Sequence, residues 1–191
     1  MAKFKLGIIV GSNRRESINR RLAQALAKLG SDGFEAKFIQ IDDLPIYNQD
    51  NEQPVPDKVA RFKAEVEASD ALLFVTPEHS RSIPAVLKNA IDWGARPWGK
   101  TSWPGKAAAI IGTSGGAIST AVAQQHLRAV LGSGAGLHVM GGEAYIAFKP
   151  DLIDAQGNVT DDTVRTFLKS FIDQFAAFAG RFAPARVQQA A

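Results

Sequence analysis

The sequence predicts an α/β protein, a three-layer sandwich in which a five-stranded parallel sheet of order 2-1-3-4-5 has helices on both faces. Strand-like and helix-like segments alternate five times along the 191 residues, and right-handed crossovers between parallel strands place helices on both sides of a sheet. Segments 3–10, 71–75 and 107–111 consist of or end in uninterrupted apolar runs, as expected for strands covered on both faces. Segment 34–38 alternates apolar and polar residues, which is typical of an edge strand.

The first three helices follow from apolar residues at helical spacing. The first begins at Ile18, where the apolar positions change to that spacing. A loop rich in proline and amide residues, 42–56, precedes the second helix. We expect the third helix to start at Ser82 or Ile83, because Pro84 is tolerated only in a first turn.

The second half of the chain continues the alternation. The third helix is expected to end at Gly94, and the fourth, which follows the strand 107–111, at Gly132. Residues 137–140 form a short fifth strand in this interpretation. Thr160 is expected to cap a last helix that carries a strong apolar face.

The composition favours a single domain, residues 1–180, followed by a loose tail, 181–191. With 46% hydrophobic residues, the chain can bury one substantial core. No signal-peptide core and no membrane-length apolar run is present, so we expect a cytoplasmic protein without a membrane partner. A net charge of +3 without a basic run argues against nucleic acid as a partner. The lack of cysteine and the wide spacing of three histidines argue against a metal site.

A polar turn, Gly11–Asn19, joins the first strand to the first helix and has the features of an anion site. Backbone N–H groups at a helix N-terminus are unpaired, and the helix dipole favours negative charge there. The turn adds hydroxyl, guanidinium and amide donors on Ser12, Arg14, Ser17 and Asn19. The planar fork of Arg14 can bind two phosphate oxygens, and Ser17 can also cap the helix. We therefore expect this turn to bind a phosphate group.

Two further loops follow strands at the same edge of the predicted sheet, Thr76–Ser82 and Gly112–Gly116. In a sheet of this order, ligands bind beyond the carboxyl ends of the strands, near the point where the strand order reverses. The first loop supplies a proline turn, backbone amides and the flat ring of His79. The second supplies small residues that let N–H groups approach a planar ring. Together the three loops are expected to hold a phosphorylated planar cofactor.

The motifs in these loops resemble those of the NAD(P)H-dependent FMN reductase family, which includes bacterial quinone and chromate reductases. They are Gly11-Ser12-x-Arg14-x-x-Ser17-x-Asn19, then Pro77-Glu78 followed by Ser82-Ile83-Pro84-x-x-Leu87-Lys88-Asn89-Ala90-Ile91-Asp92-Trp93, and then Gly112-x-Ser114-Gly115-Gly116. The similarity extends from residue 4 to residue 140. It implies a flavodoxin-like fold, bound FMN, NADH or NADPH as the hydride donor, and a homodimer or homotetramer.

The resemblance also assigns the residues that bind the cofactor. The phosphate would be held by Ser12, Arg14, Ser17, Ile18 and Asn19. The isoalloxazine ring would lie against Pro77, Glu78, His79 and Ser80, and its pyrimidine side would face Ser114, Gly115 and Gly116. Arg81 is a candidate for binding an anionic acceptor or a nicotinamide phosphate, the alternative being a solvated charge at a loop tip. The family commonly has a Tyr-Asn pair in place of His79-Ser80, which leaves the acceptor open.

The reaction that the resemblance implies runs in ping-pong order. Hydride passes from NAD(P)H to FMN, and electrons then pass to a quinone or to an oxidised metal anion such as chromate. Because the flavin carries this chemistry, no side chain is expected to act as a catalytic acid, base or nucleophile.

The stretch Gly94–Thr101 matches the P-loop pattern G-x-x-x-x-G-K-[ST]. A P-loop joins a strand to a helix, whereas this stretch follows a helix and leads into a strand. We therefore expect a loop that ends a helix, with the nearby Trp93, Trp98 and Trp103 packed in the core, near the cofactor or at an interface.

The segment Gly112–Gly116 also fits the nucleophile elbow G-x-S-x-G, so a serine hydrolase with Ser114 as nucleophile is one alternative. That mechanism needs an acid and then a histidine later in the chain. After Ser114 the first acid is Glu143 and the last histidine is His138, so only a rearranged triad is possible. A flavodoxin-type electron carrier is the other alternative. Such carriers typically have a negative net charge, whereas this chain has a net charge of +3.

Overall fold

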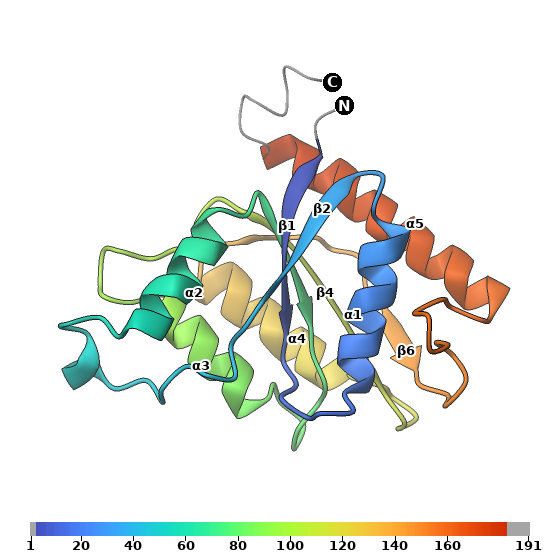
Figure 1. Ribbon diagram of the computed structural model, residues 1–191, viewed down its shortest axis with the longest axis horizontal. Helices are drawn as coiled ribbons and strands as arrows, with labels where there is room; N and C mark the ends of the chain where they lie inside the picture. The colour runs from blue at the N-terminus through green and yellow to red at the C-terminus, as the bar shows by residue number, and fades with distance from the viewer. Residues whose placement is uncertain (1–2, 183–191) are drawn as a thin grey trace.

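The computed structural model describes residues 3–182 and has a parallel sheet of order β2-β1-β3-β4-β5 (Figure 1). The predicted strand order is therefore confirmed. The strands are β1 (Phe4–Val10), β2 (Phe34–Ile39), β3 (Ala71–Val75), β4 (Ala107–Ser114), β5 (His138–Val139) and β6 (Tyr145–Ala147). The helices are α1 (Ile18–Leu29), α2 (Asp57–Glu67), α3 (Ala85–Gly94), α4 (Ala121–Ala129), with its π-helical extension Val130–Gly134, and α5 (Asp162–Ala179). Short 3-10 helices cover Gln49–Asn51 and Gly180–Phe182.

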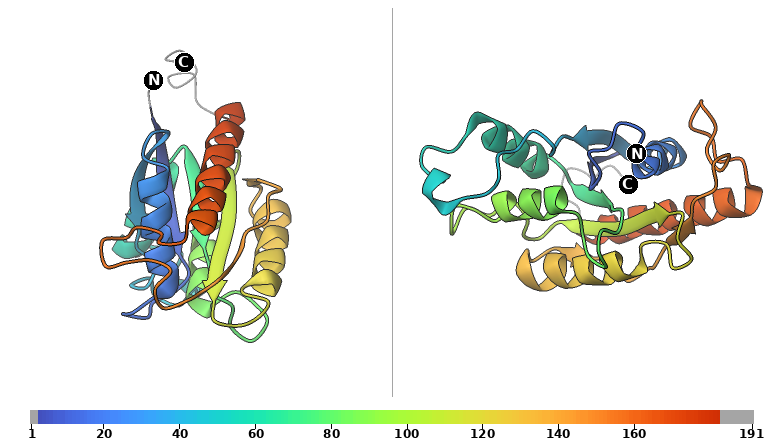
Figure 2. Two further views of the ribbon diagram at one scale, coloured as in Figure 1. Left: turned by 90° about the vertical axis from the view of Figure 1, so that its right-hand side faces the viewer. Right: turned by 90° about the horizontal axis from the view of Figure 1, so that it is seen from below.

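Helices cover both faces of the sheet, as Figure 2 shows. Alternate residues of β1 enter different cores: Leu6 and Ile8 pack with α1 and α5 on one face, and Ile9 packs with α2, α3 and α4 on the other. Every residue of β3 is buried, which accounts for its continuous apolar sequence. None of the helices within residues 3–182 is both long and apolar enough to span a bilayer.

The last strand position of the sheet is shared by two short strands. Residues 107 and 108 of β4 pair with β5, and residues 112–114 of the same strand pair in parallel with β6. The predicted fifth strand, 137–140, is confirmed at its two central residues. The sixth strand was not predicted, because three residues between a glycine pair and a proline are too few to show periodicity.

Two helices begin later than the sequence suggested. Helix α3 starts at Ala85, with Pro84 extended at its N-cap position, because Ser82 is paired with His79 in a hairpin. Helix α5 is capped by Asp161, whose Oδ1 accepts from Val164 N at 3.0 Å. The predicted cap, Thr160, instead donates its hydroxyl to Asp151 O at 2.8 Å.

The C-terminal end of the described chain is more ordered than a loose tail. Residues 180–182 form a 3-10 helix. The ring of Phe182 stacks on His138, with 4.0 Å between ring centroids and an angle of 11° between the planes. The rest of the predicted tail, 183–191, lies outside the described residues, and the domain boundary at 180 stays a prediction.

Candidate functional site

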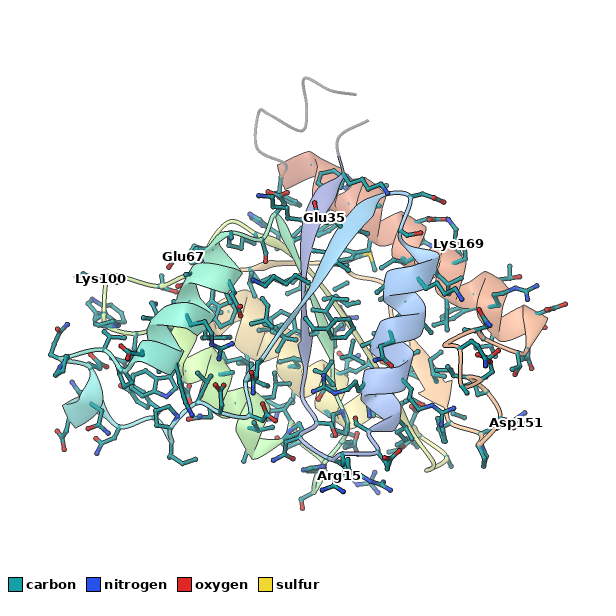
Figure 3. The ribbon with its side chains drawn as sticks, viewed as in Figure 1. Arg15, Glu35, Glu67, Lys100, Asp151 and Lys169 are labelled. Atoms are coloured by element: carbon teal, nitrogen blue, oxygen red, sulfur yellow. The ribbon has the colours of Figure 1, made fainter. Side chains whose placement is uncertain are left out.

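The three predicted loops meet at one edge of the sheet. Gly11 N donates to Val75 O at 2.9 Å, and Thr76 N donates to Ile111 O at 2.9 Å, so β1 and β3 end level with Ile111 of β4, and β4 continues for three residues to Ser114. The loops lie below the sheet in Figure 1, and Arg15 marks the same edge in Figure 3. The structure therefore brings together the predicted site residues of all three loops.

Loop one, residues 11–19, presents more hydrogen-bond donors than the folded chain uses. Ser17 caps α1, because its Oγ accepts from Arg20 N at 3.1 Å, and its hydroxyl hydrogen remains to donate. The backbone N–H groups of Ile18 and Asn19 lie in the first turn, where a helix offers them no acceptor. The exposed guanidinium of Arg14 has no hydrogen bond or ion pair to residues 3–182. These donors make loop one suitable for a phosphate.

The side chain of Asn19 also has a positioning role that sequence reasoning missed. It is 2% exposed and bonds both backbone groups of Thr113. Its Nδ2 donates to Thr113 O at 2.9 Å, and its Oδ1 accepts from Thr113 N at 3.0 Å. The amide thereby joins the start of α1 to the end of β4. Its backbone N–H remains as the group that a phosphate would use.

Loop two, residues 76–82, turns sharply at its exposed tip. His79 and Ser82 exchange backbone hydrogen bonds of 3.0 and 2.9 Å. Between them Ser80 and Arg81 have φ values of +49° and +63°, as in a type I′ turn. His79 and Ser80 are exposed and the preceding Pro77 is half-buried, so a planar ligand can reach this loop.

The carboxylate of Glu78 holds loop two against helix α4. Its side chain is only 9% exposed. Oε2 accepts from Ala123 N at 3.0 Å, near the start of α4, and Oε1 pairs with Arg81 Nη1 at 3.2 Å. Arg81 nevertheless keeps 70% of its side chain exposed. It is a cation at the rim of the site with one acidic neighbour.

Loop three, residues 112–116, begins inside β4, because the strand expected over 107–111 extends to Ser114. It combines one very close backbone contact with open glycines. A Cβ on Gly112 would lie 2.1 Å from Thr76 O, so only glycine lets β4 approach loop two this closely. At Gly115 a Cβ would have no neighbour within 4 Å. Gly115 and Gly116 are exposed. Their backbone N–H groups can therefore be approached closely by a flat ligand.

Strand β6 supports loop three from behind. Thr113 Oγ1 and Ser119 Oγ both donate to Ile146 O at 2.7 Å, and Phe148 N donates to Ser114 O at 2.9 Å. Sequence reasoning missed this support, because the partners are about thirty residues apart and no motif joins them. Loop three is consequently held by the strand that the prediction left out.

The hydroxyl of Ser114 is used within its own loop. It donates to Ser119 O at 2.8 Å and accepts from Gly116 N at 3.2 Å. Within residues 3–182, no histidine bonds to it. The serine–histidine pair that does form is Ser82 with His126, whose Oγ and Nδ1 are 2.7 Å apart. The geometry therefore gives no support to Ser114 as a hydrolase nucleophile.

The donor set fits one phosphate attached to a flat ring system. Loop one offers hydroxyl, guanidinium and backbone donors at a helix N-terminus, where an anion is favoured. Loops two and three, which are fixed to their surroundings by buried or partly buried hydrogen bonds, offer exposed backbone beside it. A phosphate on loop one would place an attached ring over these two loops.

Comparison with known proteins agrees with this geometry. The model of the NADPH-dependent FMN reductase family matches residues 4–151. The chain is 46% identical over 175 residues to a 2-hydroxy-1,4-benzoquinone reductase of Burkholderia sp., covering 92% of this chain and 96% of the relative. It is 43% identical over 176 residues to a quinone reductase of Pseudomonas putida, covering 92% and 94%.

A solved structure is similar to nearly the full length of this chain. The flavoenzyme FerB, an NAD(P)H:acceptor oxidoreductase of Paracoccus denitrificans, superposes with a TM-score of 0.91 at 41% identity, covering 95% of this chain and all of that chain. The chain therefore belongs to the NADPH-dependent FMN reductase family, which has FMN as cofactor and NAD(P)H as hydride donor.

Proposed function

We propose that the chain is a quinone reductase, which takes hydride from NADH or NADPH and passes electrons to quinones through FMN. The observation that supports this most is the set of unused donors on loop one beside the exposed backbone of loops two and three. Bound FMN would supply two-electron redox chemistry at its flavin N5. The relatives named as quinone reductases support the choice of acceptor.

The residues of loop one would bind the phosphate of FMN. Arg14 would contribute a charge-assisted fork, and the hydroxyls of Ser12 and Ser17 would donate one hydrogen bond each. Ile18 and Asn19 would use their backbone N–H groups, since the amide of Asn19 is bonded to Thr113. The positive end of α1 adds to this attraction.

Loops two and three would orient the ring. Pro77, Glu78, His79 and Ser80 would lie along one side of it. The pyrimidine edge would face Ser114, Gly115 and Gly116, where N–H donors would stabilise negative charge that develops during reduction. Because Glu78 and Ser119 hold these loops in place, the donors are oriented before the ligand arrives.

Oxidised metal anions such as chromate are proposed as further acceptors. Arg81 would attract an anion to the rim, because its guanidinium remains largely exposed. Its ion pair with Glu78 reduces that attraction, so this part of the proposal predicts only a small contribution from Arg81.

We also propose a cytoplasmic homodimer or homotetramer. Its support in the structure is three exposed apolar side chains on segments next to loop three, Ile118, Val122 and Tyr145, which are 47%, 38% and 39% exposed. Exposed apolar side chains are typical of an interaction surface when they form one patch.

The test is spectroscopic. The purified protein, or the protein reconstituted with FMN, should show flavin absorption that bleaches when NADH or NADPH is added without oxygen. Addition of a benzoquinone should restore the oxidised spectrum. Flavin that binds but is not reduced by either nucleotide would favour an electron carrier. A colourless protein that takes up no FMN and cleaves activated esters would favour the hydrolase.

A further inference from the structure

A cavity lies beside loop one, between the carboxyl ends of β1 and β2. Its volume is about 240 Å³. Ser12 and Asn13 of loop one line it together with Arg20 of α1 and the segment 38–42 that ends β2 and follows it. The cavity thus adjoins the proposed phosphate site, with which it shares Ser12. It lies toward β2, which is on the opposite side of β1 from β3 and β4, and Val86 of α3 also lines it.

The polar side chains of this cavity have no partners in the folded chain. Asn13, Arg20, Gln40 and Asp42 make no side-chain hydrogen bond or ion pair with any of the residues 3–182. The neighbouring surface is different. Asp43 pairs with Arg61 at 2.8 Å, and Arg61 in turn pairs with Glu65 at 3.2 Å. Two adjacent aspartates therefore differ. Asp43 is used in an ion pair, whereas Asp42 lines the cavity without a side-chain partner among residues 3–182.

The chemistry of the lining suits a nucleoside and one phosphate. A carboxylate and an amide, on Asp42 and Gln40, can bond the two hydroxyls of a ribose, as an acidic residue does in dinucleotide folds. Arg20 can bind a phosphate oxygen. Val10, Ile39 and Ile41 are buried and form an apolar floor for a base. The volume is below the roughly 300–1,000 Å³ of sites for whole drug-sized ligands, so a fragment fits better than a dinucleotide.

We propose that this cavity binds the adenosine half of FAD, so that the chain accepts FAD as well as FMN. The inference rests on the proposed function, because the flavin phosphate must lie on loop one. From that position the second phosphate of FAD would reach Arg20 and Asn13, and the ribose would reach Asp42. The adenosine of NADPH suits the cavity less well, since Asp42 repels its 2′-phosphate and its nicotinamide must reach loops two and three.

The test measures the affinity of the flavin-free protein for FMN and for FAD by quenching of flavin fluorescence. FAD should bind the unaltered chain with a Kd within about tenfold of that for FMN. Asp42→Ala should weaken FAD binding about tenfold, as expected for lost hydrogen bonds to a charged group, and leave FMN binding unchanged. Asp43→Ala is the matched control, because it removes the adjacent carboxylate that is used in an ion pair, and it should leave the ratio of the two affinities unchanged.

A second pair of variants tests the second phosphate. Arg20→Ala should weaken FAD binding more than FMN binding. Arg15→Ala is the control, at an exposed residue outside the cavity lining, and it should leave the ratio of the two affinities unchanged.

The outcomes separate this inference from the proposed function. FMN binding with no FAD binding, or equal weakening of both flavins by Asp42→Ala, would overturn the adenosine site and leave the reductase proposal intact. Failure of both flavins to bind would overturn both proposals. AMP that competes with FAD and not with FMN would support the adenosine site directly.

Discussion

Two stretches of the chain carry glycine, basic and hydroxyl residues in patterns associated with phosphate binding. One presents hydrogen-bond donors and the other presents hydrogen-bond acceptors. Loop one presents N–H and O–H donors that the folded chain leaves unused. The stretch Gly94–Thr101 presents carbonyl oxygens, and Lys63 binds them: its Nζ lies 3.4 Å from Gly94 O, 2.8 Å from Arg96 O and 2.7 Å from Lys100 O. In Figure 3, Arg15 and Lys100 mark these two stretches at different edges of the molecule.

The direction of the chain explains the difference. Loop one runs from a strand into a helix, so it contains the first-turn N–H groups that have no acceptor. Residues 94–101 leave the end of α3, where the unpaired groups of a helix are carbonyls and a cation is favoured. Burial lowers the pKa of Lys63. The P-loop pattern in this stretch therefore has no phosphate-binding geometry, as the sequence context predicted.

The tryptophans around this stretch divide between core and surface. Trp93 and Trp103 are buried, as the packing interpretation expected. Trp98 is 86% exposed, with Arg96 stacked 6.0 Å from its ring centroid. Core packing is therefore wrong for Trp98, and of the expected environments a place near the cofactor or at an interface stays a prediction for this residue.

The largest effect is expected where residues 94–101 meet the core. In Gly94→Ala, the new Cβ would lie 2.2 Å from Trp103 Cζ2, and that ring is fully buried and bonded to Ile91 O at 3.0 Å. We expect the free energy of unfolding, measured with urea, to fall by about 3 kcal/mol. Gly99→Ala is the control: its Cβ meets open space, and its φ of +79° costs about 1 kcal/mol. Equal losses in the two variants would contradict the packing argument.

The second effect concerns ligand binding at loop one. Arg14→Ala should weaken FMN binding by about 1.5–3 kcal/mol, the contribution of a hydrogen bond to a charged group. The stability of the flavin-free protein should not change, because Arg14 is exposed and has no partner among residues 3–182. Titration of FMN and thermal unfolding measure the two quantities. Arg15→Ala, in the same loop, is the matched control, and a loss of affinity equal to that of Arg14→Ala would reject the specific role of Arg14.

The third effect should show that Lys63 positions the loop 94–101 and takes no part in binding FMN. Lys63→Met removes three contacts to carbonyl oxygens and should lower the free energy of unfolding by about 1–2 kcal/mol, since the ammonium is only partly buried. Amide hydrogen exchange should rise in residues 94–101, while the affinity for FMN stays the same. A selective loss of FMN affinity without a loss of stability would mean that this stretch contributes to the cofactor site.

Features that depend on neighbours in sequence were predicted well. The uninterrupted apolar runs gave three central strands, and the alternation at 34–38 gave the edge. Ser17 caps α1 as expected, because a cap and its partner lie three residues apart. Thr160 failed as a cap because the adjacent Asp161 also carries a side-chain acceptor, and local sequence cannot choose between two neighbouring candidates.

Features that depend on distant contacts could not be predicted. The bonds between Asn19 and Thr113 join residues 94 positions apart, and the support of loop three by Ile146 comes from a strand of three residues. The motif letters indicated which loops form the candidate site. They did not show that the side chains of Asn19 and Glu78 hold these loops together, and the assignment of each residue to FMN stays a prediction.

The smallest effect is expected at Lys100, the residue that would be essential if residues 94–101 bound a nucleotide phosphate. Its side chain is exposed, and its contact with Lys63 uses its backbone carbonyl, which Lys100→Ala retains. Stability should therefore change by less than about 0.5 kcal/mol, as for ordinary surface substitutions, and FMN affinity should not change. Titration with Mg-ATP should show no binding to either protein. Binding of ATP that disappears in Lys100→Ala would reverse the conclusion that residues 94–101 do not bind a phosphate.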